Sequence, residues 1–181
     1  MSLPLRDRRW LRRPPHSTGT VRAWLVDRGS LTARIQARCP AFSVKLVFQG
    51  RGRVDRDETF LVPPGRRGPA LVREVYLYCR RTPVVFAHSV FNPRSLRGAW
   101  RRLARLGTRP LGAALFADPR VHRYPLRQRK LNRQHELYRR ACRALNARPP
   151  FLWARRSVFT LHNSPILVTE VFLPGIDKLR A

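Results

Sequence analysis

Two pairs of apolar runs, each joined by a short polar connection, form the clearest pattern in this chain. Polar and apolar residues alternate along much of each run, which is typical of β-strands with two different faces. A connection of four residues joins the runs of each pair, and this spacing favours antiparallel hairpins. The paired runs are 71–79 with 84–91 and 156–161 with 166–173, and further extended segments are predicted at 42–48 and 59–62.

Apolar residues at helical spacing predict helices between these strands. One such pattern begins at Ser95, carries leucine or tryptophan at positions 96, 100, 103 and 106, and stops at Gly107, a residue type that commonly ends helices. Ser30 can cap the helix that follows it, because its side chain can accept a hydrogen bond from a free backbone N–H. The predicted helices span 21–26, 31–37, 95–106, 111–116 and 126–145.

The mixture of hairpins and helices predicts an α+β fold, a single domain built on an antiparallel β-sheet. A chain of 181 residues with 43% hydrophobic residues can form one substantial core. We expect residues 1–19 to form a basic, proline-containing tail and residues 20–181 to form the domain. Within the domain, 117–150 is a basic, helix-containing segment.

Two charged residues interrupt otherwise apolar strand faces. Glu170 shares a face with Ile166, Val168 and Phe172, and the chain has only ten acidic residues. An ionised carboxylate among apolar side chains is costly unless it is paired. The natural partner is Arg73, which interrupts the strand 71–79, whereas Glu74 falls on the tyrosine face. The pattern admits a substrate site, a structural ion pair or an exposed sheet face.

The formal net charge of +28 suggests a polyanionic partner at first sight. Thirty-eight residues are Lys or Arg, but only Lys45, Lys130 and Lys178 are lysines, so thirty-five are arginines. They are spread through every segment, which is the pattern that a GC-rich genome produces. We therefore interpret the charge as a biased, solvated surface that attracts small anionic substrates, and we expect no specific nucleic-acid partner.

The cysteines indicate a reducing compartment. Cys39, Cys79 and Cys142 are odd in number, far apart and without a C-x-x-C spacing, so we expect reduced thiols rather than a disulfide or a zinc site. The pair Arg8-Arg9 resembles an export signal, but no apolar region follows it. No stretch approaches the length of a membrane span, and we expect a cytoplasmic protein.

Motifs for nucleotides, dinucleotides, serine hydrolases and zinc are absent from the sequence, and His135-Glu136 lacks the second histidine of a zinc-protease helix. We therefore expect chemistry without a metal or another cofactor. An arginine and a glutamate on neighbouring strands suit a small organic acid. The guanidinium can bind a carboxylate through two parallel hydrogen bonds, and the carboxylate can hold a hydroxyl or move a proton.

Four sequence blocks resemble those of chorismate lyase, the chorismate–pyruvate lyase of bacterial ubiquinone biosynthesis. They stand in the same order as in that family, and the resemblance covers about residues 20 to 175. The agreement of four separate blocks makes it distinctive. The blocks are Leu71-Val72-Arg73-Glu74-Val75, Gly107-Thr108-Arg109-Pro110-Leu111-Gly112, Leu152-Trp153-Ala154-Arg155-Arg156-Ser157 and Leu167-Val168-Thr169-Glu170-Val171-Phe172-Leu173-Pro174.

The resemblance implies a cofactor-independent carbon–oxygen lyase that eliminates pyruvate from chorismate and leaves 4-hydroxybenzoate. It implies an antiparallel sheet with helical flaps over a buried site. Arg73 matches the arginine that holds the ring carboxylate, and Glu170 matches the glutamate at the ring hydroxyl. Leu111 and Leu31 fall where the family surrounds the ligand with backbone groups and flap side chains, and core packing is an equal alternative at both. His88 departs from the family, because we expect an arginine there, and we assign it no role.

A ligand-sensing module is the main alternative, because effector domains of some bacterial transcription regulators share this fold and bind small acids without converting them. Such a regulator should carry a helix-turn-helix of around sixty residues, whereas only about twenty residues precede the first helix here. A nucleic-acid-binding protein is a third interpretation, and it lacks the aromatic and basic spacing of an RNA-binding sheet. The sequence indicates no oligomeric state.

Overall fold

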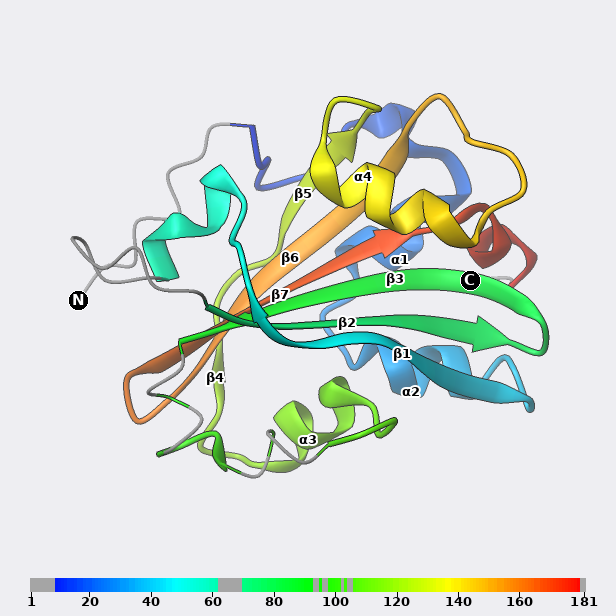
Figure 1. Cartoon of the computed structure of the whole chain (residues 1–181). Helices are drawn as coiled ribbons and strands as arrows, with labels where there is room; N and C mark the ends of the chain where they lie inside the picture. The colour runs from blue at the N-terminus through cyan, green and yellow to red at the C-terminus, as the bar shows by residue number, and fades with distance from the viewer. Residues whose placement is uncertain are drawn as a thin grey trace.

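The structure, a computed structural model, describes residues 9–61, 70–92, 95, 98–101, 103 and 106–179. Its centre is a seven-stranded antiparallel sheet in the order β1-β2-β3-β7-β6-β4, with β5 paired to β6. Helix α4 lies on one side of the sheet, and α2 and α3 lie on the other (Figure 1). The predicted α+β fold with an antiparallel sheet is confirmed. The strands are β1 (Phe42–Gly52), β2 (Ala70–Cys79), β3 (Thr82–Phe91), β4 (His122–Arg123), β5 (Arg127–Leu131), β6 (Leu152–Leu161) and β7 (Ser164–Phe172), and the α-helices are α1 (Arg22–Val26), α2 (Leu31–Gln36), α3 (Leu111–Ala117) and α4 (Glu136–Ala141).

Both predicted hairpins are present. Strands β2 and β3 pair antiparallel, as do β6 and β7. The second hairpin turns through His162 and Asn163, whose φ angles are 46° and 59°. Two central residues with positive φ match the twist of the flanking strands, which explains the tight connection. The strands of both hairpins begin one to four residues before their predicted limits, because pairing with neighbours continues beyond the apolar pattern, and β7 ends one residue before its predicted limit.

Two local predictions were wrong. Residues 56–61 form a 3-10 helix rather than an extended segment, and the Glu58 carboxylate accepts a hydrogen bond from the Asp55 backbone N–H at 3.0 Å. The predicted helix 126–145 is instead β5, α4 and a short 3-10 helix, Cys142–Ala144. Pairing of β5 with β6 satisfies the backbone of 127–131, so tertiary pairing overrides the helical spacing there.

The predicted helix 95–106 is absent as an α-helix from its described residues, which form turns and single 3-10 hydrogen bonds, such as Leu103 N–H to the Trp100 carbonyl at 2.9 Å. Leu96 lies outside the described residues. The expected basic tail is partly packed onto the domain: Trp10 is buried, and Leu11 exchanges backbone hydrogen bonds of 2.7 and 2.9 Å with Gln128.

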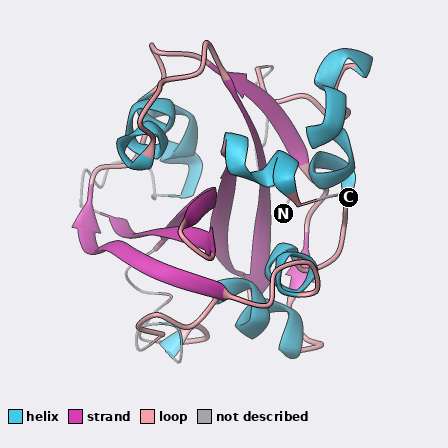
Figure 2. Ribbon diagram, turned by 90° about the vertical axis from the view of Figure 1, so that its right-hand side faces the viewer, coloured by secondary structure: helices cyan, strands magenta, loops and turns pink. Residues whose placement is uncertain are grey.

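Each face of the sheet is covered by its own apolar cluster, and Figure 2 shows helices on either side of the strands. On one face, Val75 and Leu77 of β2 pack with residues of α1 and α2, including Trp24 and Leu31. On the other face, Tyr76 packs with residues of α4. Because side chains alternate along β2, this strand contributes residues to both clusters.

The expectation of reduced thiols was wrong for two cysteines. Cys39 and Cys79 form a disulfide, with their Cα atoms 5.7 Å apart, and Cys142 is free and buried. The pairing of Phe42 with Cys79 brings the end of β2 next to the segment before β1. This proximity depends on the strand pairing and leaves no trace in the spacing of the cysteines.

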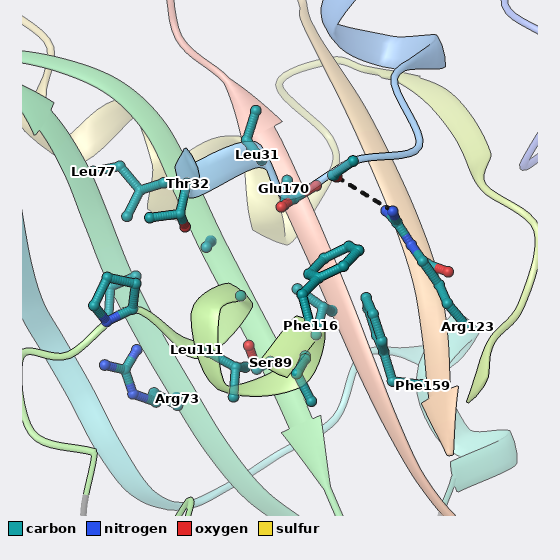
Figure 3. A pocket seen from close by; sticks show the side chains of 18 residues that line it. Leu31, Thr32, Arg73, Leu77, Ser89, Leu111, Phe116, Arg123, Phe159 and Glu170 are labelled. Carbon is teal, nitrogen blue, oxygen red and sulfur yellow. Dashed lines mark hydrogen bonds between the residues drawn. The ribbon is translucent and has the colours of Figure 1, made fainter. Parts of the chain in front are cut away.

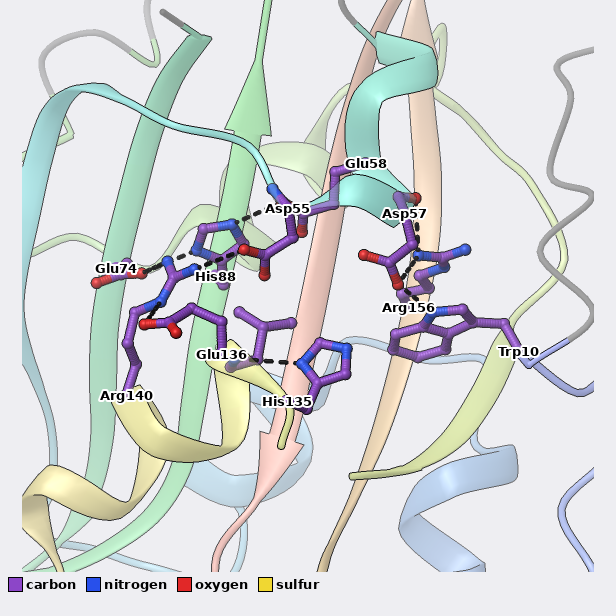
Figure 4. A network of polar contacts seen from close by, with 11 residues as sticks. Trp10, Asp55, Asp57, Glu58, Glu74, His88, His135, Glu136, Arg140 and Arg156 are labelled. Atoms are coloured by element: carbon purple, nitrogen blue, oxygen red, sulfur yellow. Dashed lines mark hydrogen bonds and ion pairs between the residues drawn. The ribbon is translucent and has the colours of Figure 1, made fainter. Parts of the chain in front are cut away.

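A polar network occupies the sheet face beneath α4 (Figure 4). Glu74, His88, Thr169 and Arg156 follow one another across β2, β3, β7 and β6 in a continuous row. His88 is fully buried; its Nδ1 lies 3.0 Å from Glu74 Oε1 and its Nε2 lies 3.3 Å from Glu58 Oε2. His88 is therefore held between two carboxylates, a structural role that the sequence did not reveal.

The two carboxylates determine the charge of His88. Burial by itself lowers the pKa of His88, but the charge of Glu58 and the hydrogen bonds with Glu58 and Glu74 outweigh burial and raise the pKa to about 9. Arg140 binds Glu74 and, at 3.0 Å, Asp55 on the same face. Burial and then the charge of Glu58 raise the pKa of Asp55 to about 6. At neutral pH the imidazolium therefore donates to both of its neighbours.

We expect the free energy of unfolding to fall as the pH rises through about 9. A histidine whose pKa is higher in the folded state stabilises the fold fully below its unfolded pKa of about 6.5 and loses that contribution above its folded pKa. The expected loss is about 3 kcal/mol. Denaturant unfolding at several pH values between 6.5 and 10 measures this loss; Asp55, with a pKa of about 6, still titrates at the lower end of the range, so a control variant is needed.

The matched control is His88→Gln, which keeps one hydrogen-bond donor and removes the titration. The variant should be less stable at pH 6.5, and the difference from the unmodified protein should shrink towards pH 10. A difference that stays constant over this range would show that His88 is not charged in the folded protein.

Candidate active site

A pocket lies between the opposite face of the sheet and the helices α2 and α3 (Figure 3). All four residues that the sequence singled out line it, namely Arg73, Leu111, Glu170 and Leu31. They come from β2, α3, β7 and α2, so their proximity arises from the fold rather than from sequence spacing.

The strand registers put charged residues on the floor of this pocket. Val75, Ala87, Glu170 and Arg155 follow one another across β2, β3, β7 and β6. The adjacent row on the same face begins with Arg73, opposite Ser89 of β3. Ala87 and Ser89 are small, so β3 leaves space between the charged residues of its two neighbours. This space forms the centre of the pocket.

Arg73 is a buried cation with neutral partners. It is 3% exposed, and its Nη2 donates to the backbone carbonyls of Gly107 at 2.8 Å and Arg109 at 3.1 Å. Its Nε is buried and has no hydrogen-bond partner in the described part of the chain. Burial lowers the pKa of Arg73. An anionic ligand would offset the cost of burying this charge.

The partner of Glu170 is not Arg73, as the sequence suggested, but Arg155 on the neighbouring strand. Arg155 Nε lies 2.6 Å from Glu170 Oε2. The Arg155 side chain is fully buried, whereas that of Glu170 is 18% exposed. Arg155 Nη1 also donates to the carbonyls of Trp24 at 2.6 Å and Asp27 at 2.7 Å. Arg155 thus fixes one carboxylate oxygen of Glu170.

Helices α2 and α3 cover the pocket. Ser30 caps α2, its side chain accepting from Ala33 N–H at 3.3 Å, as predicted. The two helices approach closely at Gly112, where a Cβ atom would lie 3.2 Å from Thr32 Oγ1. Leu31 and Leu111 are buried in apolar clusters and also line the pocket. Both leucines therefore belong to the core and line the pocket, and whether they enclose a ligand stays a prediction.

Sequence reasoning missed several lining residues. The missed residues include Arg123, Ser89, Ser157 and Phe116, and Arg123 belongs to the basic segment 117–150. The block around Arg155 was recognised, but nothing in its spacing assigned that residue to Glu170. The missing signal was the register of β6 against β7, which pairs Arg155 with Glu170.

The pocket suits a small anionic ligand with a hydroxyl group. Its lining is largely apolar, with arginines at two places, one glutamate, and the hydroxyl groups of Thr32, Ser89 and Ser157. Among the described residues, no group of three or more His, Cys, Asp or Glu side chains could hold a metal ion. No helix in the described ranges is long and apolar enough to cross a membrane.

Solved structures with a similar fold include a GntR-family transcriptional regulator from Bacillus cereus, with a TM-score of 0.52 and 10% identity over 75% of this chain and 93% of that one. The PhnF C-terminal domain matches with a TM-score of 0.57 and 12% identity, covering 82% of this chain and 92% of that domain. The effector domain of PhnF from Mycobacterium smegmatis matches with a TM-score of 0.51 and 16% identity, covering 81% of this chain and 90% of that one. At such low identity these similarities support the fold alone.

Sequence comparison is far more specific. The chorismate lyase family model matches residues 8–179. A relative from Nitrosospira multiformis named "Probable chorismate pyruvate-lyase" is 55% identical over 171 residues, which cover 94% of this chain and 95% of the relative. A relative of the same name from Nitrosomonas europaea is 50% identical over 170 residues, covering 94% and 96%. The chain belongs to the chorismate lyase family.

Proposed function

We propose that this protein is a chorismate lyase that converts chorismate to 4-hydroxybenzoate and pyruvate without a metal or organic cofactor. The observation that carries the proposal is the covered pocket in which Arg73 and Glu170 face the same space. Family membership gives the reaction class. We further propose that the product enters ubiquinone biosynthesis in the cytoplasm, as the family resemblance implies.

The proposed pose follows from the charges. Arg73 binds the ring carboxylate, because its guanidinium is held by neutral carbonyls and its Nε is unpartnered in the described residues. Glu170 accepts a hydrogen bond from the ring hydroxyl at C4. Leu31 and Leu111 close the pocket around the ring. Exclusion of water strengthens each of these polar contacts.

The reaction gains its driving force from aromatisation of the cyclohexadiene ring. The hydrogen at C4 leaves, the bond between C3 and the ether oxygen breaks, and the released electron pair departs on the enolpyruvate oxygen. The enolpyruvate takes up a proton at its methylene carbon and becomes pyruvate. Glu170 can accept the C4 proton, or it can orient the hydroxyl while the hydrogen passes directly to the methylene group. The balance of atoms is the same in both routes.

A non-catalytic module that senses small acids is the alternative, and the fold of the PhnF effector domains is its support. The two functions make opposite predictions for chorismate. A lyase consumes chorismate, whereas a sensing module binds it unchanged. The sequence relatives favour the lyase, because their identities are several times higher than those of the regulators.

Purified protein treated with a chelator should convert chorismate into equal amounts of 4-hydroxybenzoate and pyruvate. Absorbance follows the aromatic product, and a coupled assay follows pyruvate. Folded protein that yields no product above the uncatalysed background would contradict the proposed reaction. Activity that is lost with the chelator and restored by a metal ion would contradict cofactor independence alone.

Arg73→Ala should weaken the binding of chorismate and 4-hydroxybenzoate together, by roughly 2–5 kcal/mol, because it leaves a ligand carboxylate buried and unpaired. Arg73→Lys should recover only part of this affinity, since an ammonium cannot reproduce the guanidinium fork.

Glu170→Gln keeps the shape of the side chain and removes the carboxylate. If Glu170 accepts the proton, the single-turnover rate should fall by about two to four orders of magnitude; if it orients the hydroxyl, most of the rate should remain. Unchanged binding and turnover in all three variants would refute the site.

Arg155 and Arg156 offer a matched pair, since both are buried and face opposite sides of the sheet. Arg156 contacts Asp57 at 3.1 Å beneath α4, whereas Arg155 holds Glu170. Arg155→Lys cannot keep all three hydrogen bonds, so Glu170 should shift and kcat should fall about ten- to hundredfold. Arg156→Lys should lower the thermal stability and leave kcat little changed at temperatures well below unfolding. Equal effects on kcat would show that Arg155 has no special role in positioning Glu170.

A further inference from the structure

Chorismate carries two carboxylates, one on the ring and one on the enolpyruvyl group, and Arg73 accounts for the first. The enolpyruvyl ether at C3 is adjacent to the C4 hydroxyl, so a hydroxyl held by Glu170 brings the second carboxylate to the Glu170 side of the pocket. We propose that Arg123 binds this second carboxylate and thereby distinguishes the substrate from the aromatic product. The inference rests on the proposed function, because it assumes chorismate in the pocket.

Arg123 reaches the pocket from the edge of the sheet. It belongs to the short strand β4, where it pairs with Phe159 of β6. Among the described residues that line the pocket, Arg73 and Arg123 are the two with positive side chains. They come from β2 and β4, with β3, β7 and β6 between them, and Figure 3 shows them on different sides of the pocket. Two separated cations match a ligand with two separated carboxylates.

Neutral groups hold the Arg123 guanidinium in place. Its Nη1 donates to the carbonyls of Arg28 at 2.6 Å and Gly29 at 3.5 Å. The guanidinium carbon lies 5.3 Å from the ring centre of Phe116 and 5.2 Å from that of Phe159, which are cation–π distances. The contacts fix the cation without neutralising it, as the carbonyl contacts do at Arg73.

Arg123 has a hydrogen-bond donor available for a ligand. Its Nε is buried and has no hydrogen-bond partner in the described ranges. Burial lowers the pKa of Arg123, and the nearby charge of Glu170 acts in the opposite direction. A half-buried guanidinium that lacks a bound carboxylate carries a desolvation cost that an anionic ligand can offset. Arg123 and Glu170 line the same pocket, and Figure 3 shows Arg123 on the Glu170 side of it, away from Arg73.

The expected consequence is a selective loss of substrate binding. Arg123→Gln should lower kcat/KM for chorismate by roughly 30-fold or more, the fold-change expected when a buried charge pair loses one partner. The inhibition constant of 4-hydroxybenzoate should stay nearly unchanged, because that product has no enolpyruvyl carboxylate. Arg123→Lys should recover part of the loss. Arg120→Gln is the control, since Arg120 is exposed and pairs with Asp118 outside the pocket.

Two ring compounds test the same inference by direct binding, without turnover. 3-(Carboxymethoxy)-4-hydroxybenzoate carries a second carboxylate at the ether position, and 3-methoxy-4-hydroxybenzoate is its neutral counterpart there. The unmodified protein should bind the first at least about tenfold more tightly, and Arg123→Gln should abolish this preference. Equal or weaker binding of the first compound by the unmodified protein would overturn the inference, even if the variant fails to fold.

The outcomes separate this inference from the proposed function. Failure of the unmodified protein to convert chorismate would refute the lyase reaction, while the preference between the two ring compounds would still report on Arg123. A different result is that the unmodified protein converts chorismate while Arg123→Gln loses affinity for chorismate and 4-hydroxybenzoate equally. That result would assign Arg123 to general packing and overturn the inference. Unchanged kcat/KM in Arg123→Gln would also overturn it.

Discussion

Adjacent residues of a β-strand face opposite sides of the sheet, and this constraint organises the whole molecule. Arg73 and Glu74 on β2, and Arg155 and Arg156 on β6, are sequence neighbours that the strands send to different faces. One row across the sheet ends in Glu170 and Arg155 on the pocket side, and the next row contains His88 and Arg156 on the other. A shift of one residue in the register of β7 would move each of its side chains, Glu170 and Thr169 included, to the opposite face of the sheet. The pocket and the network beneath α4 therefore depend on the same strand pairing.

Charged side chains have different partners on the two faces of the sheet. Five of the ten acidic residues contribute to the network of Figure 4, where His88 and the arginines are paired with carboxylates. They are Asp55, Asp57, Glu58, Glu74 and Glu136. On the pocket face, Arg73 and Arg123 are held by backbone carbonyls, and the one glutamate is held by Arg155. Half of the acidic residues thus stabilise the structure beneath α4, while the pocket contains cations whose charge a ligand can complement.

The sequence predicted what depends on local pattern. Alternation and turn residues revealed both hairpins, Ser30 revealed the start of α2, and two charges on apolar strand faces revealed Arg73 and Glu170. Long-range pairing was beyond this reasoning. It determines that 127–131 is a strand rather than a helix, that Glu170 pairs with Arg155, and that Cys39 meets Cys79. Three of the four blocks of the family resemblance contain Arg73, Leu111 and Glu170. Arg123 was not predicted, because it lies in a two-residue strand with no recognisable sequence pattern.

The charged floor of the pocket is also connected to one of its covering helices. Arg155 binds the carbonyls of Trp24 and Asp27, and Arg123 binds those of Arg28 and Gly29. These carbonyls belong to the segment that leads directly into α2. A helix of six residues such as α2 has little stability of its own, so its position depends on such anchors and on the burial of Leu31 and Ile35. A ligand bound to Glu170 and Arg123, as proposed, would therefore contact residues that are linked through Arg155 and Arg123 to the segment before α2.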